Sequence, residues 1–507
     1  MELGPVPSFR AQACALPRAW LQRTRRGYYE PRSGQISLLP RTPAYMASGG
    51  DGWSHSGPWP YLQEVPLVFY GPGIVPATGD TATRATIADI APTTAALLGA
   101  RFPAGDGDVL EEVVRQRARP PQLVVTIVWD GGGWNTLRQW PEDWPNLARL
   151  MRRGVSFTRA TVGSSPSVTP AVHSTLGTGS YPWKAGVTGV PVRDEEGEVV
   201  DAFLEGASSR FLKLPAFAEV WDERHGNRPL VGMLGYEPWH LGMVGKGAER
   251  PGGDRDDAVW LNVETNEWVT NDAHYTLPDE VVRTRGLAAY LDALDAADGA
   301  IDRSWRGHAI LDAPDRVEET PAFVRYHTDA LLNLLRDGGY GDDRTTDLLF
   351  TNYKQIDRVG HYFNMASEEV HDSLAATDEE LGRIVAALDA EVGRGRYVVI
   401  VTADHGQQPD AAAVDGFGID PNEVERDIDA AFGPVADAVW PTEVFLDDEA
   451  LEREDVAVAE VARWLGDYRV EDNEPDPDPG GTGRLAASDR VFALAIPATV
   501  LPEMDCG

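Results

Sequence analysis

The sequence predicts an α/β fold, a three-layer sandwich in which helices cover both faces of a mostly parallel central sheet. Apolar runs of strand length, such as 123–130 and 346–353, alternate with helical segments along the chain. These runs are apolar nearly throughout, which is typical of strands that are buried on both faces. Strands and helices that alternate in this way form parallel sheets covered by helices.

The predicted units follow one another along the chain. The first is an apolar strand followed by a helix that is apolar on one side, and the second strand precedes a helical stretch that ends in ARLMRRG. A third strand and a long helix lead to a fourth strand, which ends in the motif ADHG. Ligands of such sheets bind beyond the carboxyl ends of the strands. The predicted strands are 65–70, 123–130, 346–353 and 396–406. The predicted helices are 85–99, a stretch that ends with 148–154, and 367–391.

Length and composition predict one large domain with insertions. The chain has 507 residues, of which 42% are apolar, so it has ample material for a core. We expect a single α/β domain over 1–507. An inserted cap is expected over 199–324, where Trp, Gly, Asp and Pro are frequent and periodicity is weak. A second insertion spans roughly 410–440, and the acidic tract 471–483 is expected to be a solvated linker.

Charge and the two cysteines limit the partners and the compartment. The net charge of −35 repels phosphate backbones and anionic membranes, so we expect neither a nucleic-acid duplex nor a membrane as a partner. No apolar run approaches the roughly 18 residues of a membrane span, and no signal peptide is evident, so we expect a cytoplasmic protein. Cys14 and Cys506 are expected to be free thiols in a reducing compartment.

Three acidic residues follow predicted strands: Asp130, Asp357 and Asp404. Each alone has an ordinary explanation, because Asp often caps a turn or a helix at a strand end. In the motif DRVGH, however, Asp357 and His361 are four residues apart, so a helical turn would place both on one face. Asp404 and His405 are adjacent in ADHG. Carboxylates and imidazoles that converge at one sheet edge suit zinc or manganese, whereas calcium and magnesium prefer oxygen ligands.

A candidate nucleophile lies in the hydroxyl-rich stretch 162–179. Thr169 opens a segment that predicts a helix, with Pro170 at the favourable first helical position. A hydroxyl there faces the positive end of the helix and can approach a metal ion. Coordination to a metal ion lowers the pKa of such a hydroxyl, so that it can be held as an alkoxide near neutral pH. A free threonine cannot form an alkoxide there.

Taken together, WDGGG, TPAVHSTLGTG, DRVGH and ADHG resemble the metal motifs of the alkaline phosphatase superfamily. The similarity is greatest to the nucleotide pyrophosphatase/phosphodiesterase-like branch, which uses a threonine nucleophile. It covers 123–190 and 345–408, together with the segment near His55. Each motif is short, but their order and spacing make the resemblance specific.

The resemblance implies a site with two divalent ions, zinc or manganese. One ion would be held by Asp130, Asp404 and His405, with Thr169 beside it. Asp357 and His361 would hold the other, together with one more histidine that the family has downstream of ADHG. None of the ten histidines of this chain follows His405.

The missing histidine implies a circular permutation. The segment SHSGPWPYLQEVPLVFYGPGI resembles one that normally lies near the C-terminus of the family, so residues 1–110 would be the usual tail placed at the head. His55 would then be the missing ligand; the alternative is an idle loop residue. Termini of compact domains often lie close together, which makes the permutation physically acceptable. It would bring Cys506 near Cys14.

The function implied by the resemblance is hydrolysis of a small phosphoester through a phospho-threonine intermediate, followed by attack of water activated at the second ion. Phosphodiesters or nucleotide pyrophosphates are the first choice of substrate. Phosphomonoesterase, phosphonate or sulfate hydrolase, phosphoglycerate mutase-like transferase and a catalytically silent metal-binding scaffold remain alternatives. A phosphate-binding Asn expected by the resemblance is replaced by Val190, which leaves the substrate class open.

Several other polar residues are weaker candidates. His173 lies one helical turn after Thr169 and is expected to have a structural role. His240 and Lys246 either line the pocket or are merely packed or solvated. A Gly/Asp-rich turn carries Asp254, Asp256 and Asp257, which are expected to be solvated, with a surface calcium site as the alternative.

Overall fold

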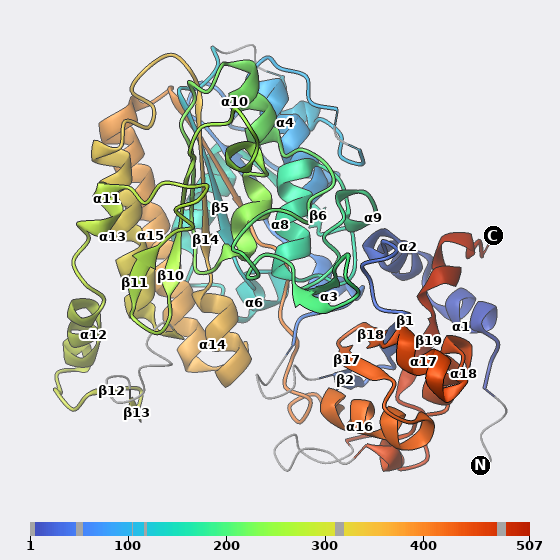
Figure 1. Cartoon of the computed structure of the whole chain (residues 1–507). Coiled ribbons are helices and arrows are strands. Elements are labelled where there is room, and N and C mark those ends of the chain that lie inside the picture. Colours follow the sequence, from blue (N-terminus) through green and yellow to red (C-terminus); the bar gives the residue numbers. More distant parts are fainter. Residues whose placement is uncertain are drawn as a thin grey trace.

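A nine-stranded sheet forms the centre of the computed structural model (Figure 1). The structure describes residues 6–46, 54–103, 105–115, 119–309, 319–473 and 483–506. β3 is antiparallel to both of its neighbours and β11 to β10, whereas all other neighbouring strands of this sheet run parallel. The predicted mostly parallel sheet is therefore confirmed. In spatial order its strands are β11 (Glu267–Val269), β10 (Asp257–Asn262), β9 (Val231–Leu234), β14 (Asp347–Tyr353), β5 (Leu123–Trp129), β15 (Tyr397–Thr402), β3 (Leu67–Tyr70), β6 (Val155–Thr161) and β4 (Gly79–Thr86).

The middle strand β5 shows why the sheet needs a helical layer on each side. Its seven residues are all buried, and most are β-branched or aromatic, which suits a pleated strand between two covered faces. Alternate side chains of a strand point to opposite faces. Val125 and Ile127 accordingly pack into one hydrophobic core, and Val124 and Val128 pack into another.

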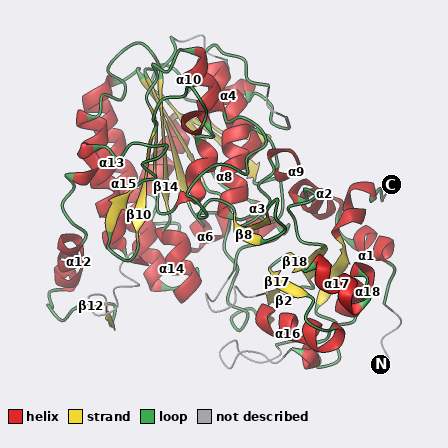
Figure 2. Ribbon diagram, in the orientation of Figure 1, coloured by secondary structure: helices red, strands yellow, loops and turns green. Residues whose placement is uncertain are grey.

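The helices form the two outer layers of the sandwich (Figure 2). One core is shared with α6 (Trp134–Gln139), α7 (Pro145–Arg153), α11 (Asp279–Val282), α12 (Ala288–Asp295), α13 (Pro321–Asp337), α14 (Gln355–Phe363) and α15 (Glu368–Leu388). The core on the other face is shared with α4 (Ile90–Leu97), α5 (Glu111–Val114), α8 (Thr169–Thr178) and α10 (Phe217–Arg224). Short elements complete this part: α3 (Pro60–Gln63), α9 (Pro182–Ala185), and the hairpins of β7 (Pro191–Arg193) with β8 (Val199–Asp201) and of β12 (Ser304–Trp305) with β13 (His308–Ala309).

The two ends of the chain build a second, four-stranded antiparallel sheet beside the main one (Figure 1). Its order is β17 (Ala436–Trp440), β18 (Glu443–Leu446), β1 (Ile36–Pro40) and β19 (Phe492–Pro497). It has a hydrophobic core of its own, which the sequence analysis did not anticipate. Around it lie α1 (Phe9–Ala15), α2 (Arg18–Gly27), α16 (Pro421–Phe432), α17 (Asp448–Glu454) and α18 (Val458–Leu465), and the parallel pair of β2 (Ala44–Met46) with β16 (Phe417–Ile419).

The region 199–324 contributes strands as well as loops. β9 pairs with β14 and β10 pairs with β9, so this region extends the main sheet on one side. Most of the acidic tract 471–483 lies outside the described residues, as do 310–318 at the end of the expected cap.

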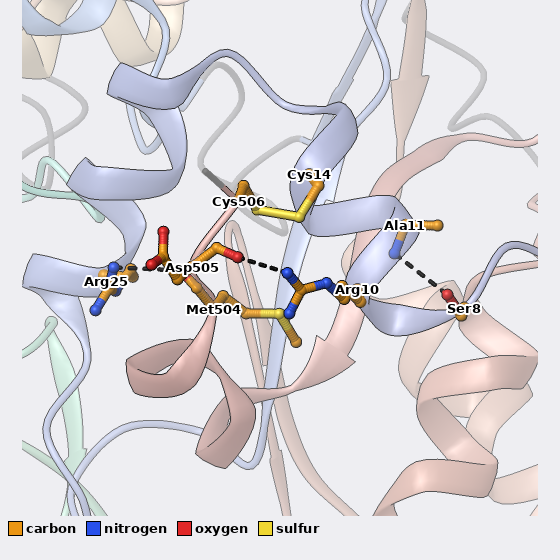
Figure 3. The surroundings of a disulfide bond; sticks show 8 residues. All are labelled: Ser8, Arg10, Ala11, Cys14, Arg25, Met504, Asp505 and Cys506. Atoms are coloured by element: carbon orange, nitrogen blue, oxygen red, sulfur yellow. Dashed lines mark hydrogen bonds between the residues drawn. A yellow bond between two sulfur atoms is a disulfide. The ribbon is translucent and has the colours of Figure 1, made fainter.

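A disulfide joins the two ends of the chain. The Cα atoms of Cys14, in α1, and Cys506 are 5.3 Å apart, and their sulfurs are bonded (Figure 3). The Arg10 guanidinium donates to the Asp505 carbonyl at 2.8 Å beside this bond, and Arg25 donates to the Met504 carbonyl at 3.3 Å. The expectation of two free thiols is therefore wrong. The nearness of Cys506 to Cys14, which the family resemblance implies, is found, although 492 positions separate the two cysteines in the chain.

Within the described ranges, none of the helices combines the length and the apolar character needed to cross a lipid bilayer.

Candidate metal centre

The main sheet brings the three acids that were predicted after its strands to one edge. β5 runs parallel to β14 on one side and to β15 on the other, and Leu123 is in register with the first residue of each neighbour, Asp347 and Tyr397. The carboxyl ends of these strands therefore lie level, and the residues that follow them meet. Asp130 directly follows β5, and the backbone N–H of Gly131 donates to Asp404 Oδ1 at 3.1 Å.

The glycines after Asp130 allow this close approach. Gly131 has φ = +67°, in the left-handed region that glycine favours. A Cβ at this position would lie 2.9 Å from the Cα of Asp357, and one at Gly133 would lie 2.5 Å from the Cα of Gly406. The GGG sequence thus lets the loop after β5 touch the loops that carry the other acids.

Helix α14 brings Asp357 and His361 to the same face, as their spacing predicts. His361 Nε2 lies 3.3 Å from Asp357 Oδ2. The side chain of Asp357 is 1% exposed and that of His361 is 11% exposed.

His55 comes from the N-terminal segment and completes this cluster. Its Nε2 lies 3.7 Å from Asp357 Oδ1, and its ring stacks on that of His405, with centroids 3.6 Å apart and planes inclined by 5°. His55 Nδ1 donates to the Ser167 carbonyl at 3.1 Å, and the Ser167 hydroxyl donates back to the His55 carbonyl at 3.0 Å. These bonds fix the ring and leave Nε2 as the free nitrogen, which is how proteins commonly present a histidine ligand.

His405 is fixed in the same manner. Its Nδ1 donates to the Gly406 carbonyl at 3.0 Å, so its Nε2 faces Asp130 Oδ1 at 3.4 Å and Asp404 Oδ2 at 3.5 Å. Among the described residues, neither His405 Nε2 nor Asp404 Oδ2 finds a hydrogen-bond partner, although both are buried. Buried polar atoms that face one another without hydrogen bonds fit a position for a cation.

Thr169 begins α8 and lies beside these ligands. Pro170 occupies the first turn, where its missing N–H costs nothing, and Gly179 closes the helix with φ = +62°. The Thr169 hydroxyl is 3.4 Å from Asp130 Oδ2 and is almost fully buried. The structure thus brings all seven expected site residues together: His55, Asp130, Thr169, Asp357, His361, Asp404 and His405.

Two groups of ligand atoms can each hold a cation. His55, Asp357 and His361 form one, and Asp130, Asp357 and His405 form the other; within each group the atoms lie within 4.8 Å of one another. Imidazole nitrogens combined with carboxylate oxygens suit zinc or manganese. The residues present therefore fit a metal centre, in which Asp357 belongs to both groups.

The sequence also matches a known family over most of this architecture. Residues 124–475, more than half of the chain, match the family described as type I phosphodiesterase / nucleotide pyrophosphatase. The chain belongs to this family. The match begins within β5 and takes in Asp130, Thr169, Asp357 and His405, whereas His55 lies before it.

Individual proteins are also similar to this member of the phosphodiesterase family. The chain is 23% identical over 418 residues to a protein named calcium-transporting ATPase from Myroides odoratus, covering 68% of this chain and 73% of that one. It is 24% identical over 334 residues to the alkaline phosphatase PafA from Elizabethkingia meningoseptica, covering 56% and 60%. A crystal structure of alkaline phosphatase PafA superposes with a TM-score of 0.57 at 19% identity, covering 68% of this chain and 76% of that one. The structure comparison supports an alkaline phosphatase-like fold.

Lys354 also reaches into the site of this family member, and the sequence analysis missed it. It stands between β14 and α14, three residues before Asp357. Its Nζ lies 2.6 Å from Asp357 Oδ2, 2.9 Å from Asp130 Oδ1 and 3.1 Å from Thr169 Oγ1. The available signal was a lysine directly after a buried strand and three residues before Asp357.

Burial and charge set the protonation of the acids. Burial alone would raise the pKa of Asp130 and of Asp357, but the Lys354 ammonium holds the pKa of both carboxyls below their usual range. Both are thus ionised at neutral pH, the form that binds a cation. Burial, reinforced by repulsion from Asp130, raises the pKa of Asp404 to about 7. Burial opposes the charged form of His405, yet the carboxylates, Asp404 foremost, raise its pKa to about 9.

A hydrogen-bonded chain behind the site supports Asp130. Asn352 Nδ2 donates to Asp130 Oδ2 at 3.0 Å and lies 3.4 Å from His173 Nε2, and His173 Nδ1 lies 2.9 Å from His240 Nδ1. Burial lowers the pKa of His173 to about 3, so the ring is neutral. His173 is thus a hydrogen-bonded, buried group one turn along α8.

The remaining candidates lie elsewhere. Lys246 is bonded to the Leu212 carbonyl at 2.6 Å. Asp257 accepts a hydrogen bond from the Tyr340 hydroxyl at 2.8 Å, whereas Asp254 and Asp256 form an acidic cluster with Asp222.

Proposed function

We propose that this chain is a metal-dependent hydrolase of small phosphoesters that forms a phospho-threonine intermediate at Thr169. Its family consists of enzymes that hydrolyse phosphoric ester bonds, so the reaction class follows from membership. The observation that carries the mechanism is the position of the Thr169 hydroxyl, 3.4 Å from Asp130 Oδ2 at the start of α8 and beside two groups of metal-ligating atoms.

The proposed ligands divide into two triads. Asp130, Asp404 and His405 would hold one ion, and His55, Asp357 and His361 would hold the other. Two divalent ions, zinc or manganese, would neutralise the phosphate and lower the pKa of the Thr169 hydroxyl and of a water molecule. The Nδ1 bonds of His55 and His405, which turn their Nε2 atoms toward the acids, and the ionised state of Asp130 support metal binding by these residues.

The residues of the chain then carry out two displacements. Thr169 Oγ1 attacks phosphorus, the ester oxygen leaves and takes up a proton, and a phospho-threonine forms. Water next attacks this phosphorus, so that the Thr169 oxygen leaves and regains its proton while the phosphate product departs. The orientation of Thr169 matters in both steps, and the first turn of α8 provides it. The N-terminal end of this helix also favours the negative charge that develops there.

Diesters and nucleotide pyrophosphates are the proposed first class of substrate, in line with the family that the chain matches. Monoesters are the second candidate, since relatives such as PafA are named alkaline phosphatases.

Turnover of two chromogenic esters tests the proposal. Purified protein loaded with zinc or manganese is assayed with bis-p-nitrophenyl phosphate and with p-nitrophenyl phosphate, before and after dialysis against a chelator. We expect hydrolysis that is lost with the ions and restored by adding them back, with the diester preferred. A preference for the monoester would select the second candidate. Absence of any turnover by metal-loaded protein would favour a silent metal-binding scaffold.

A further inference from the structure

We propose that Lys354 binds a phosphate oxygen of the substrate beside Thr169. This inference rests on the proposed function, because it assumes that Thr169 meets a phosphate group. It assigns a catalytic role to a residue that lies outside both metal-ligating triads.

The first argument is the distance from Lys354 to the nucleophile. Its Nζ lies 3.1 Å from Thr169 Oγ1. An atom poised for attack lies about 3–3.5 Å from the atom that it attacks. The nonbridging oxygens lie one P–O bond from that phosphorus and surround it, so one of them can come within hydrogen-bonding range of an ammonium group that is itself beside Oγ1.

The second argument is the competition for the carboxylates. Lys354 Nζ now contacts Asp357 Oδ2 and Asp130 Oδ1, so it bridges the two triads. Cations bound to these carboxylates would repel the ammonium and displace it from at least part of these contacts. A phosphate that lies between the triads is then the nearest remaining anion for the ammonium to contact.

The third argument is burial. The side chain of Lys354 is only 3% exposed, and its Nζ lies 5.6 Å from the centre of the Trp239 ring. A buried ammonium that loses its counter-ions must gain another, because an unpaired buried charge is very costly. Since Lys354 is fixed between β14 and α14, its short displacement remains inside the site.

The competing explanation is that Lys354 is only a counter-ion for Asp130 and Asp357. Under that explanation, loss of the ammonium frees both carboxylates for metal ions. The bound ions would then be retained or held more tightly, and the affinity for phosphate would not change. The two explanations therefore differ in phosphate binding, which can be measured without any ester turnover.

The experiment compares Lys354→Met and Lys354→Arg with the wild-type protein, all loaded with zinc. Metal content is measured by plasma mass spectrometry, and the affinity for inorganic phosphate by isothermal titration calorimetry. Circular dichroism and thermal melting establish that each variant is folded. The control is Lys246→Met, since Lys246 is a partly buried lysine that bonds to the Leu212 carbonyl.

We expect Lys354→Met to keep its ions and to bind phosphate about 10- to 100-fold more weakly, as for the loss of a hydrogen bond to a charged group. Lys354→Arg should recover part of this affinity, and Lys246→Met should match the wild type. Unchanged phosphate affinity in folded Lys354→Met would overturn the inference, and so would loss of an ion. If the wild type cleaves no ester but its phosphate affinity depends on Lys354, the proposed function fails while this inference stands.

Discussion

The imidazole ring of His55 lies flat against that of His405, with centroids 3.6 Å apart and an angle of 5° between the planes. One ring comes from the N-terminal segment and the other from the loop after β15, and each has its Nδ1 bonded to a backbone carbonyl. Their Nε2 atoms face Asp357 and Asp130 respectively. This pair shows how the N-terminal segment becomes part of a site whose other residues lie between Asp130 and His405 in the chain.

Replacing His55 by Ala should remove one of two ions. The remaining ligands of that triad, Asp357 and His361, leave it short of a nitrogen donor, so we expect about one ion per chain and a decrease in kcat/KM of at least about 100-fold. Metal analysis and steady-state kinetics check this. His274→Ala, outside the site, should match the wild type. Full metal content together with full activity in His55→Ala would refute the assignment.

The Thr169 hydroxyl should be indispensable, whereas its methyl group should not. We expect Thr169→Ala to lose about 1,000-fold or more of kcat, and Thr169→Ser to keep measurable turnover, because only the serine retains an attacking oxygen. Acid quenching during turnover followed by peptide mass spectrometry should find phosphate on Thr169. Thr175→Ala, which removes a hydroxyl bonded to the Ala171 carbonyl inside α8, is the control. A phosphopeptide from another position would exclude Thr169 as the nucleophile.

Reduction of the Cys14–Cys506 bond should lower stability but leave the site intact. Closing so long a loop restricts the unfolded chain, so we expect a loss of about 2–4 kcal/mol in the free energy of unfolding. Thermal melting with and without a reductant, and of Cys14→Ser, measures this loss, and activity at room temperature should change little. Labelling by a maleimide should require prior reduction. Disulfides are typical of oxidising compartments. The two cysteines therefore give no support to the reducing compartment that was expected from free thiols.

Glu443 should make the protein less stable as the pH rises. It lies at the start of β18 and accepts a hydrogen bond from the Gly34 N–H at 2.9 Å, and burial raises the pKa of its carboxyl from 4.5 to about 7. The folded state thus binds the proton more tightly than the unfolded state. The contribution of Glu443 to stability is full below about pH 4.5 and is lost progressively up to about pH 7.

Glu443→Gln isolates this effect, because an amide can still accept the bond from Gly34 but does not ionise. The variant should gain about 2–3 kcal/mol relative to wild type between pH 5 and pH 8. Urea unfolding of both proteins at several pH values gives the difference. Glu452→Gln, on the exposed side of α17, should leave the pH profile unchanged. An equal pH dependence of wild type and Glu443→Gln would contradict the prediction.

The local pattern of the chain was sufficient for the main sheet and for most of the candidate site. Continuous apolar runs identified β5, β14 and β15, and the acids directly after them are brought together by the parallel register. The spacing of Asp357 and His361 sufficed to place both on one helical face. These features follow from contacts within one strand or one helical turn.

Features that depend on distant parts of the chain were not predictable in the same way. In the second sheet β1, from the N-terminal part of the sequence, pairs with β18 and β19, from the C-terminal part. Local periodicity does not predict such a pairing. The pairing of β1 with β19 also brings Cys14 close to Cys506, and the bond between them was not predicted. β9 is only four residues long and lies in a Gly- and Pro-rich region, so its strand pattern is weak. Lys354 was not predicted, for a different reason. Its place in the site depends on its contacts with Asp130 and Asp357, which a lysine taken alone in the sequence does not indicate.

The position of β1 between β18 and β19 has a consequence for synthesis on the ribosome. Both of its neighbours are translated long after it, and β15, one of the two partners of β3, is translated long after β3. These early strands therefore emerge with at least one unpaired edge and wait for partners that are synthesised much later. Exposed edges of this kind bind other chains readily. The nascent protein should therefore depend on chaperones to a greater degree than a relative whose strands emerge next to their partners.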